Sequence, residues 1–306
     1  MTGTVEATGG QNLNAAAVDN KVKQIVSNIR NLPTPPIVFH QIQKVINDPL
    51  VSAGQIAKIL QEDPAMSVKV LKLTNSAFYG LAREVESVKQ AVVIVGLEAI
   101  KNLVLSASVL DMFKGKDIDQ EFQDKFWRHS LAVGFCARIL ARKVRARGMI
   151  DPDSAFSAGL LHDIGKVILC CFLPKEHAAV KAERENNTEL ESYQLEENVL
   201  GYNHAQIGAI LAEQWKLPSR LATAVSYHHH PHNCESDELI PYVINVANYV
   251  AKDTFYDNFE RHLVGNVTEG VLEFLQIEES TLESLSEALR EEYLKAETFM
   301  QMAGIT

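Results

Sequence analysis

The stretch DPLVSAGQIAKILQEDPAMSVKVLKLTNSAFYG, residues 48–80, shows how helices are delimited along this chain. Ser52 predicts the N-cap of one helix, and Asp63-Pro64 predicts its end and the start of a second, because proline fits the first helical turn. Gly80 predicts the end of that second helix. Apolar residues recur at helical spacing, so we expect a helical hairpin that buries Ile56, Ile59, Leu60, Val68, Leu71 and Leu73.

The same delimiters continue on both sides of this stretch. In residues 87–113, Ser87 predicts another helix start and Gly96 a break before the next helix. The alternating pattern of β-strands is scarce. We therefore predict an all-α fold, a helical bundle of two packed halves. The expected divisions are a flexible leader (1–18), a first helical half (20–120), a second helical half (121–254) and a helical tail packed on the domain (255–306).

Composition narrows the class of partner. The 306 residues are 46% hydrophobic and carry a net charge of −10, which argues against nucleic acid because phosphate backbones attract positive surfaces. No apolar run approaches the roughly 20 residues that span a bilayer, so we expect no membrane partner. Four cysteines without CxxC spacing, and no signal peptide, indicate a reduced, cytoplasmic protein.

The C-terminal stretch 281–301, TLESLSEALREEYLKAETFMQ, is acidic and amphipathic. An apolar face on such a helix can pack on its own chain or form a contact between two copies in a homodimer, and the sequence leaves both open. The residues expected on that face are Leu282, Leu285, Leu289 and Leu294.

Histidines decide the candidate site. The chain has ten of them, and His129 shares a helical face with Val133, Cys136 and Leu140, so it points inward. His204 follows Asn203, a good N-cap. His162 precedes Asp163 in the apolar segment GLLHDIGKVIL (159–169), and His228 and His229 end a helix before Pro231. The expected metal ligands are His129, His162, Asp163, His204, His228 and His229, with His230 and His232 outside the site.

Burying many imidazoles without partners would cost several kcal/mol, since each unsatisfied polar group costs roughly 1–3 kcal/mol. One shared metal would satisfy them together. Imidazoles with a carboxylate suit iron, manganese, nickel or zinc better than calcium or magnesium. We therefore predict a divalent transition metal as cofactor. Lys166 is a weak candidate for a phosphate contact; the alternative is a solvated lysine at the start of a helix.

The spacing of His129, His162-Asp163, His204 and His228-His229 resembles the HD superfamily of metal-dependent phosphohydrolases. Further motifs are similar to those of HDOD-domain proteins: NLPTPP (31–36), the hairpin 48–80, YNHAQIGAILAEQWKLP (202–218) and AVSYHHHP (224–231). The resemblance covers about residues 22–250. It implies a helical fold whose second half is HD-like, and a bacterial role in signal transduction without proven hydrolase activity.

Two departures from catalytic relatives bear on activity. The paired histidines are followed by HPHNCESDELIP (230–241), which lacks the glycine-tyrosine-proline signature of cyclic-di-GMP phosphodiesterases. Asn248 stands where the resemblance places a ligating aspartate. A neutral amide is a poor metal ligand, so one anionic group is missing. We expect weak metal binding and little or no hydrolysis of cyclic dinucleotides.

Two functions therefore remain open. One is a regulatory signalling domain with a protein partner, non-catalytic and retaining a metal site. The other is a metal-dependent phosphohydrolase that binds a nucleotide or another phosphoester. In either case we expect a groove between the halves, bordered by the metal site and by the segment around Asn75, Phe78 and Tyr79. Phe78 can also pack as a core residue, whereas Tyr79 is expected at the junction.

Overall fold

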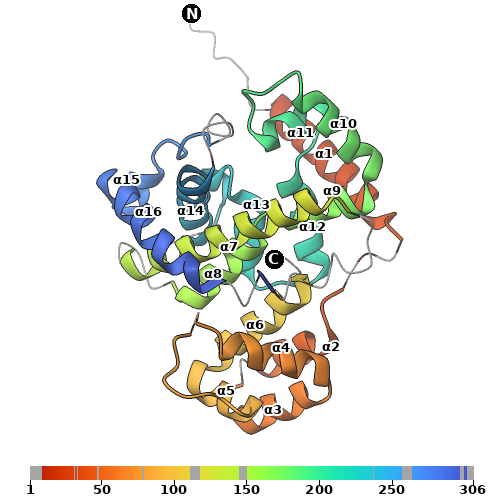
Figure 1. The fold of residues 1–306 in the computed structure, drawn as a ribbon. Coiled ribbons are helices and arrows are strands. Elements are labelled where there is room, and N and C mark those ends of the chain that lie inside the picture. Colours follow the sequence, from red (N-terminus) through yellow and green to blue (C-terminus); the bar gives the residue numbers. More distant parts are fainter. Residues whose placement is uncertain are drawn as a thin grey trace, which may run out of the picture.

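The computed structural model of the chain is built from helices (Figure 1). It describes residues 9–30, 32, 34–46, 48–77, 79–110, 118–144, 150–236, 238–256, 264–296 and 300–301. Within these ranges no residue belongs to a β-strand, so the all-α prediction is confirmed. Helices α2 to α6 form a smaller lobe, and the helices from α7 onward form a larger one (Figure 1).

The smaller lobe has helix ends set by local hydrogen bonds. Ser52 and Gln55 form a capping box at the start of α3. Asp63 and Ser87 each accept a hydrogen bond from the backbone amide three residues on, at the starts of α4 and α5. The helices are α2 (Ile37–Val45), α3 (Ala53–Gln61), α4 (Pro64–Thr74), α5 (Val88–Val95) and α6 (Leu97–Leu110). The predicted starts at Ser52, Asp63 and Ser87 are therefore confirmed.

The predicted inner face of α4 is wrong at one position. Val68 is 53% exposed, although Leu73 is fully buried. The buried side of α4 is formed by Met66, Val70 and Leu73, which are spaced by four and three residues. Val68 lies two residues from Met66, and a helix turns such a neighbour to the opposite side.

Helix α6 joins the lobes, because it packs against α2, α4 and α5 and also against α8. Tyr79 lies at the same junction, as expected: the guanidinium of Arg138 lies 5.7 Å from its ring centre. Nε of Arg138 is in turn 3.4 Å from Oδ1 of Asp153. Phe78 lies outside the described residues.

The larger lobe surrounds α7 and α8, which pack along each other, while α14 lies against α7. Its elements are α7 (Gln120–Lys143), α8 (Pro152–Leu161), α9 (Ile164–Phe172), α10 (Pro174–Arg184), α11 (Ser192–Leu200), α12 (His204–Gln214), α13 (Ser219–Tyr227), the 3-10 turn η1 (Pro231–Asn233) and α14 (Ile240–Phe255). Most of the buried apolar side chains on these helices belong to one continuous core shared with the smaller lobe.

The N-terminal segment differs from its prediction. Helix α1 (Gly9–Ser27) begins well inside the range expected to be a loose leader, and it contains a run of alanines, the best helix formers. Val22 and Val26 are buried, and α1 packs against α12 of the larger lobe. Nζ of Lys21 also donates to the carbonyl of Leu200 at 2.9 Å. Residues 20–27 therefore pack with the larger lobe, away from α2 to α5 (Figure 1).

The C-terminal helices pack on their own chain. They are α15 (Val271–Leu275), α16 (Ser280–Tyr293) and the 3-10 turn η3 (Leu294–Ala296), and α16 lies against α7 and α14. Leu285 and Leu289 are buried as predicted, but Leu294 is 82% exposed. The α-helix ends at Tyr293, so the helical phase that would turn Leu294 inward is lost at η3.

One segment of the described chain, Pro152–Phe172, is long and apolar enough to cross a membrane, and a bent pair, Val88–Val95 with Leu97–Val109, passes the same test only as one span. Of the most apolar window of the first segment, 78% is buried inside the molecule. It contains His162 and Asp163, both of which are buried, so this segment forms part of the core.

Candidate metal centre

The six predicted ligands come from distant parts of the larger lobe and meet around one carboxylate. They are His129 on α7, His162 and Asp163 between α8 and α9, His204 at the start of α12, and His228 and His229 at the end of α13. We call these six residues the histidine cluster. Asp163 is 1% exposed and is the residue shared by both groups of facing ligand atoms.

One group consists of His129, His162 and Asp163, whose ligand atoms all lie within 4.8 Å of one another. Oδ2 of Asp163 is 3.4 Å from Nε2 of His162 and 3.7 Å from Nε2 of His129. Two imidazoles, one from the middle of α7 and one from the end of α8, thus face the same oxygen of Asp163.

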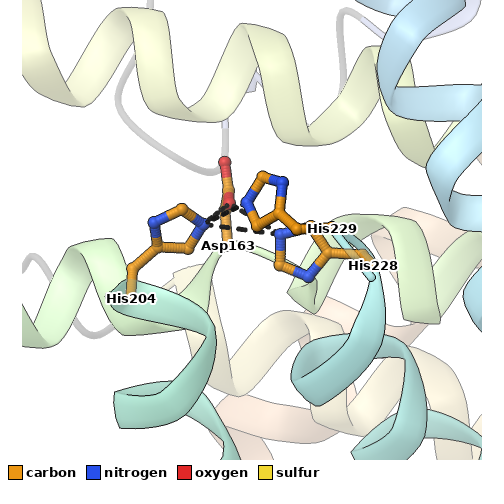
Figure 2. Close-up of side chains that lie close together, drawn as sticks. All are labelled: Asp163, His204, His228 and His229. Carbon is orange, nitrogen blue, oxygen red and sulfur yellow. Dashed lines mark hydrogen bonds and ion pairs between the residues drawn. The ribbon is translucent and has the colours of Figure 1, made fainter. Parts of the chain in front are cut away.

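The other group consists of Asp163, His204, His228 and His229, and Figure 2 shows the three imidazoles gathered at the Asp163 side chain. Oδ1 of Asp163 is 2.9 Å from Nε2 of His204 and 3.6 Å from Nε2 of His228. Nε2 of His229 is 3.0 Å from Nε2 of His204. The two groups therefore lie on either side of the Asp163 carboxylate.

Close backbone packing brings these elements together. A Cβ atom on Gly159 of α8 would lie 2.7 Å from Cα of Gly134 on α7, so the absence of both side chains lets α8 touch α7. A Cβ atom on Gly165 of α9 would overlap the carbonyl oxygen of His204. Glycine is required at such approaches because real Cβ atoms do not come this close to backbone. These contacts fix the distance between His129, the turn at Asp163, and His204.

Hydrogen bonds set which nitrogen of each ring faces the cluster. Nδ1 of His162 lies 2.7 Å from the carbonyl of Gly159, and Nδ1 of His228 lies 3.0 Å from the carbonyl of Val225. A carbonyl oxygen only accepts, so both Nδ1 atoms carry the proton and both Nε2 atoms present a lone pair. Metal-ligating histidines typically donate their second ring N–H in this way.

For His204, the acceptor of the second ring N–H is a carboxylate, that of Glu196. Its Oε2 accepts hydrogen bonds from the backbone N–H of His204 at 2.7 Å and from Nδ1 at 2.6 Å. This carboxylate was not predicted from the sequence. Glu196 is the buried acidic residue on α11, and the sequence carried no signal for it because that burial is a property of the tertiary structure.

Two ring nitrogens in the cluster have no hydrogen-bond partner although they are buried: Nε2 of His129 and Nε2 of His162. Each faces Oδ2 of Asp163, at 3.7 Å from His129 and 3.4 Å from His162, without forming a hydrogen bond to it. A buried polar atom without a partner costs about 1–3 kcal/mol. A cation between these atoms would satisfy both lone pairs and the carboxylate at once, so the residues fit a metal ion.

The pKa shifts of these residues also favour metal binding. Burial lowers the pKa of His129 to about 3 and holds that of His162 and His229 well below its usual range. These imidazoles are therefore neutral, which is the form that binds metal. Burial alone would raise the pKa of Asp163. The neighbouring His162 and Lys166 side chains hold this pKa well below its usual range, so Asp163 is an anion.

His204 behaves differently. Burial would lower its pKa, but the adjacent Glu196 outweighs burial and the pKa of His204 is raised. The carboxylates of Glu196 and Asp163 face its two ring nitrogens and favour a proton on each of them. Binding of a metal at Nε2 would release that proton.

Asn248 lies on α14 and belongs to neither group of ligand atoms. It is 7% exposed, and its Oδ1 has no hydrogen-bond partner. Together with His229 it lines a polar cavity of about 370 Å³ on the far side of the cluster. A second buried ammonium lies there: Nζ of Lys252 is 3.0 Å from Oε2 of Glu191. This pair was missed because the two residues are far apart in sequence.

Lys166 is not the solvated lysine that we weighed as the alternative. Its Nζ is 2.6 Å from Oδ2 of Asp163, and its side chain is only 23% exposed. Although burial acts to lower it, the facing Asp163 raises the pKa of Lys166, so the ammonium form persists. Positions i and i+3 share a helix face, which was the available sequence signal.

A cavity of about 290 Å³ opens beside Asp163. Its floor includes His129, Asp163 and Lys166, and its walls combine aromatic and basic side chains. The aromatic and basic side chains in this lining include Phe122, Lys125, Phe126, Lys181, Arg184 and Tyr256. This position places a ligand in the cavity beside Lys166 and Asp163.

His230 and His232 lie outside the cluster, as expected. His230 is exposed, and Nε2 of His232 donates to the carbonyl of Glu269 at 2.8 Å.

The predicted groove shared by the metal site and the Asn75 segment is wrong for the described residues. The cavity bordered by Asn75 and Ser76 shares no lining residue with the cavity beside Asp163. Asn75 instead fixes its own lobe, because its side chain exchanges hydrogen bonds of 2.8 and 2.7 Å with the backbone of Val85.

Comparison with known proteins gives one family match. The family model for the HDOD domain matches residues 32–231. An uncharacterised protein of Treponema pallidum (strain Nichols) is 26% identical over 272 residues, which are 86% of this chain and 51% of the relative. The chain thus spans about half the length of this curated relative.

Solved structures share the fold. A protein of Marinobacter aquaeolei VT8, provisionally named a signal transduction protein, is 22% identical with a TM-score of 0.73, over 96% of this chain and 66% of that one. A provisionally named phosphohydrolase of Shewanella amazonensis SB2B is 24% identical with a TM-score of 0.70, over 92% and 97% of the two chains. At these identities the likeness concerns the helical architecture.

Proposed function

We propose that this chain, which belongs to the HDOD domain family, is a regulatory signal-transduction domain that holds a divalent transition metal and is not an efficient hydrolase. One observation carries the proposal: buried Nε2 atoms of His129 and His162 face the Asp163 carboxylate without hydrogen-bond partners. The cluster residues His129, His162, Asp163, His204, His228 and His229 would hold iron, manganese, nickel or zinc.

A metal held there would supply Lewis acidity toward a phosphoryl oxygen. The chain's own residues argue against rapid turnover. Asn248, which stands in place of an expected carboxylate, is neutral and outside the ligand groups. Lys166 occupies one oxygen of the sole cluster carboxylate. Catalytic metal sites need a fixed, charge-balanced ligand shell, so we expect binding and signalling rather than hydrolysis, with a partner protein receiving the signal.

None of the four cysteines forms a disulfide. Reduced thiols are typical of proteins in a reducing compartment, and we therefore keep the cytoplasm as the proposed location.

A second function is favoured by a different observation. The cavity beside Asp163 is lined by Lys125, Lys166, Lys181 and Arg184, although the chain has a net charge of −10. Basic side chains beside a metal site suit a phosphoester or nucleotide substrate. The alternative is therefore a metal-dependent phosphohydrolase.

Metal analysis and a hydrolysis assay on the same samples distinguish these functions. We expect the purified wild type to bind one of the four metals, Asp163→Ala to lose it, and neither to hydrolyse cyclic-di-GMP efficiently. The matched control is Asp63→Ala, which removes a carboxylate that only caps α4. It should retain the metal and lose about 1 kcal/mol of stability.

Each result has a different meaning. Robust hydrolysis by the wild type that disappears in Asp163→Ala would establish the phosphohydrolase. Failure of the wild type to bind any of the four metals would reject the metal site and the phosphohydrolase, and would leave only regulation without a metal.

A further inference from the structure

Lys166 has two environments at once. Its ammonium lies 2.6 Å from Oδ2 of Asp163, the oxygen that also faces His129 and His162. The same side chain lines the cavity beside the cluster. It therefore stands between the proposed metal position and any ligand that enters the cavity.

The other basic residues of the cavity have different partners. Nζ of Lys181 is 3.3 Å from Oδ2 of Asp119, and Nζ of Lys125 is 3.1 Å from Oε1 of Glu121. Among the residues that line this cavity, Lys166 is the one cation that is paired with a residue of the histidine cluster. An oxyanion at the floor would meet this ammonium first.

We propose that Lys166 couples the two ligands of this site: it is the internal counter-ion of Asp163 in the metal-free protein, and it turns to an oxyanion in the cavity when a metal binds. The inference rests on the proposed metal site, and it assigns a phosphate group as the ligand class of the cavity. Metal and phosphate then bind cooperatively.

The physical reason is competition between two cations for one oxygen. A divalent ion beside Oδ2 repels the Lys166 ammonium and pairs with the Asp163 carboxylate in its place. Lysine carries its charge on a flexible four-carbon stem, so the ammonium can swing toward the cavity without moving α9. There it needs a new anion, because a buried charge without a partner is costly. A phosphate supplies that anion, and so each ligand favours the other.

The cavity walls indicate which phosphates fit. Phe122, Phe126 and Tyr256 line the same space as the basic residues. Aromatic surface near a cationic floor suits a phosphate monoester with an apolar or aromatic group better than the inorganic ion. Inorganic phosphate and phenyl phosphate therefore serve as the two probes.

The experiment measures Mn²⁺ binding to the full chain, from the electron paramagnetic resonance signal of the free ion, with and without each probe. For the wild type we expect each probe to lower the Kd for Mn²⁺ by a factor within roughly 5–150, the range of typical site–site coupling. Reciprocity requires Mn²⁺ to lower the Kd of the probe by the same factor. This pair of wild-type measurements needs no variant.

Lys166→Met removes the competing cation. We expect it to bind Mn²⁺ more tightly than the wild type without phosphate, and to show no further gain when phosphate is added. Lys166→Gln keeps a neutral donor for Asp163 and serves if the methionine variant does not fold. The matched control is Lys181→Met, in the same cavity but paired with Asp119: it should weaken phosphate binding and leave the coupling factor unchanged.

The results separate the inference from the proposed function. If wild type and Lys166→Met bind Mn²⁺ equally and respond equally to phosphate, Lys166 is not the coupling group, while the metal site stands. If the wild type binds Mn²⁺ but neither probe changes its Kd, the coupling is wrong. If no variant binds Mn²⁺ at all, the inference and the metal site are both rejected for this ion.

Discussion

Both lobes contain helix caps and buried polar groups, but within the described residues only the larger lobe gathers buried histidines around a carboxylate. In the smaller lobe, Ser52 and Asp63 cap helices, and Asn75 ties its helix end to Val85, all through short-range hydrogen bonds. In the larger lobe, polar side chains lie at the centre of the core. His162, Asp163, His204, His228 and Asn248 are all buried there.

This difference indicates which polar groups are kept for stability and which for function. A cap satisfies a backbone group that would otherwise be unpaired, so it stabilises the fold. The buried Nε2 atoms of His129 and His162 destabilise it, because they have no partner in the protein. Residues at functional sites typically depart from the packing and hydrogen-bonding rules that stabilise the rest of a fold.

The largest expected effect concerns acid sensitivity of the larger lobe without metal. The folded-state pKa of His129 is lowered by burial to about 3, and those of His162 and His229 are lowered for the same reason. Below pH about 6.5 these histidines bind protons in the unfolded chain but stay neutral in the folded protein, so the free energy of unfolding falls as the pH falls. Between pH 6.5 and 5.5 each ring contributes about 1 kcal/mol, or about 3 kcal/mol together, and the slope approaches about 1.4 kcal/mol per pH unit for each ring at lower pH.

His204, whose pKa is raised, is protonated in both states below pH about 6.5 and adds no loss. Denaturant unfolding with a chelator, at pH 6.5 and 5.5, measures the effect through Trp127 and Trp215, both buried in the larger lobe. A change below about 1 kcal/mol between these two values would contradict the neutral cluster.

The next effect tests the backbone contact that positions the turn at Asp163. Gly165→Ala should destabilise the protein by about 3 kcal/mol, the upper end for overpacking, because the new Cβ would overlap the carbonyl of His204. Its control in the smaller lobe is Gly54→Ala, where the Cβ would meet only Oγ of Ser52 at 3.8 Å. That variant should be neutral or gain up to about 1 kcal/mol from helix propensity. Equal thermal shifts for the two variants would remove the contrast.

Glu196→Gln should weaken metal binding roughly 10- to 100-fold, as is usual when the outer partner of a ligating histidine is altered. The amide still accepts a hydrogen bond from His204, so the fold should persist while the charge that favours this ligand is lost. Glu62→Gln is the control, because Glu62 is an exposed partner of Gln41 in the smaller lobe. Dialysis against Mn²⁺ or Zn²⁺ measures both, and similar affinities would show that Glu196 does not support the site.

The smallest effect is expected for Asn75→Ala. It removes both hydrogen bonds to Val85 and should cost about 1–2 kcal/mol of stability. Metal affinity should not change, because the cavity at Asn75 is separate from the one beside Asp163. Chemical denaturation and metal titration of the same sample provide the measurement. A loss of metal affinity would connect the lobes in a way that their packing does not indicate.

The sequence by itself determined the helical class, the capped helix starts and which residues form the cluster. Caps such as Ser52, Asp63 and Asn203 are hydrogen bonds within three residues, so the pattern contains the whole interaction. The inward phase of His129 is likewise a property of one helix.

Only the tertiary structure decided which partners these residues receive. Glu191 reaches Lys252 across 61 residues, and α1 packs on α12 although more than half the length of the chain separates them. Local patterns were wrong about Val68 and Leu294, which they placed on buried faces although both are exposed. Helical phase fixes the direction in which a side chain leaves its own helix. The neighbour that it meets depends on where another helix lies. Close backbone contacts, such as Gly165 against His204, fix that position, and they exist only in the folded protein.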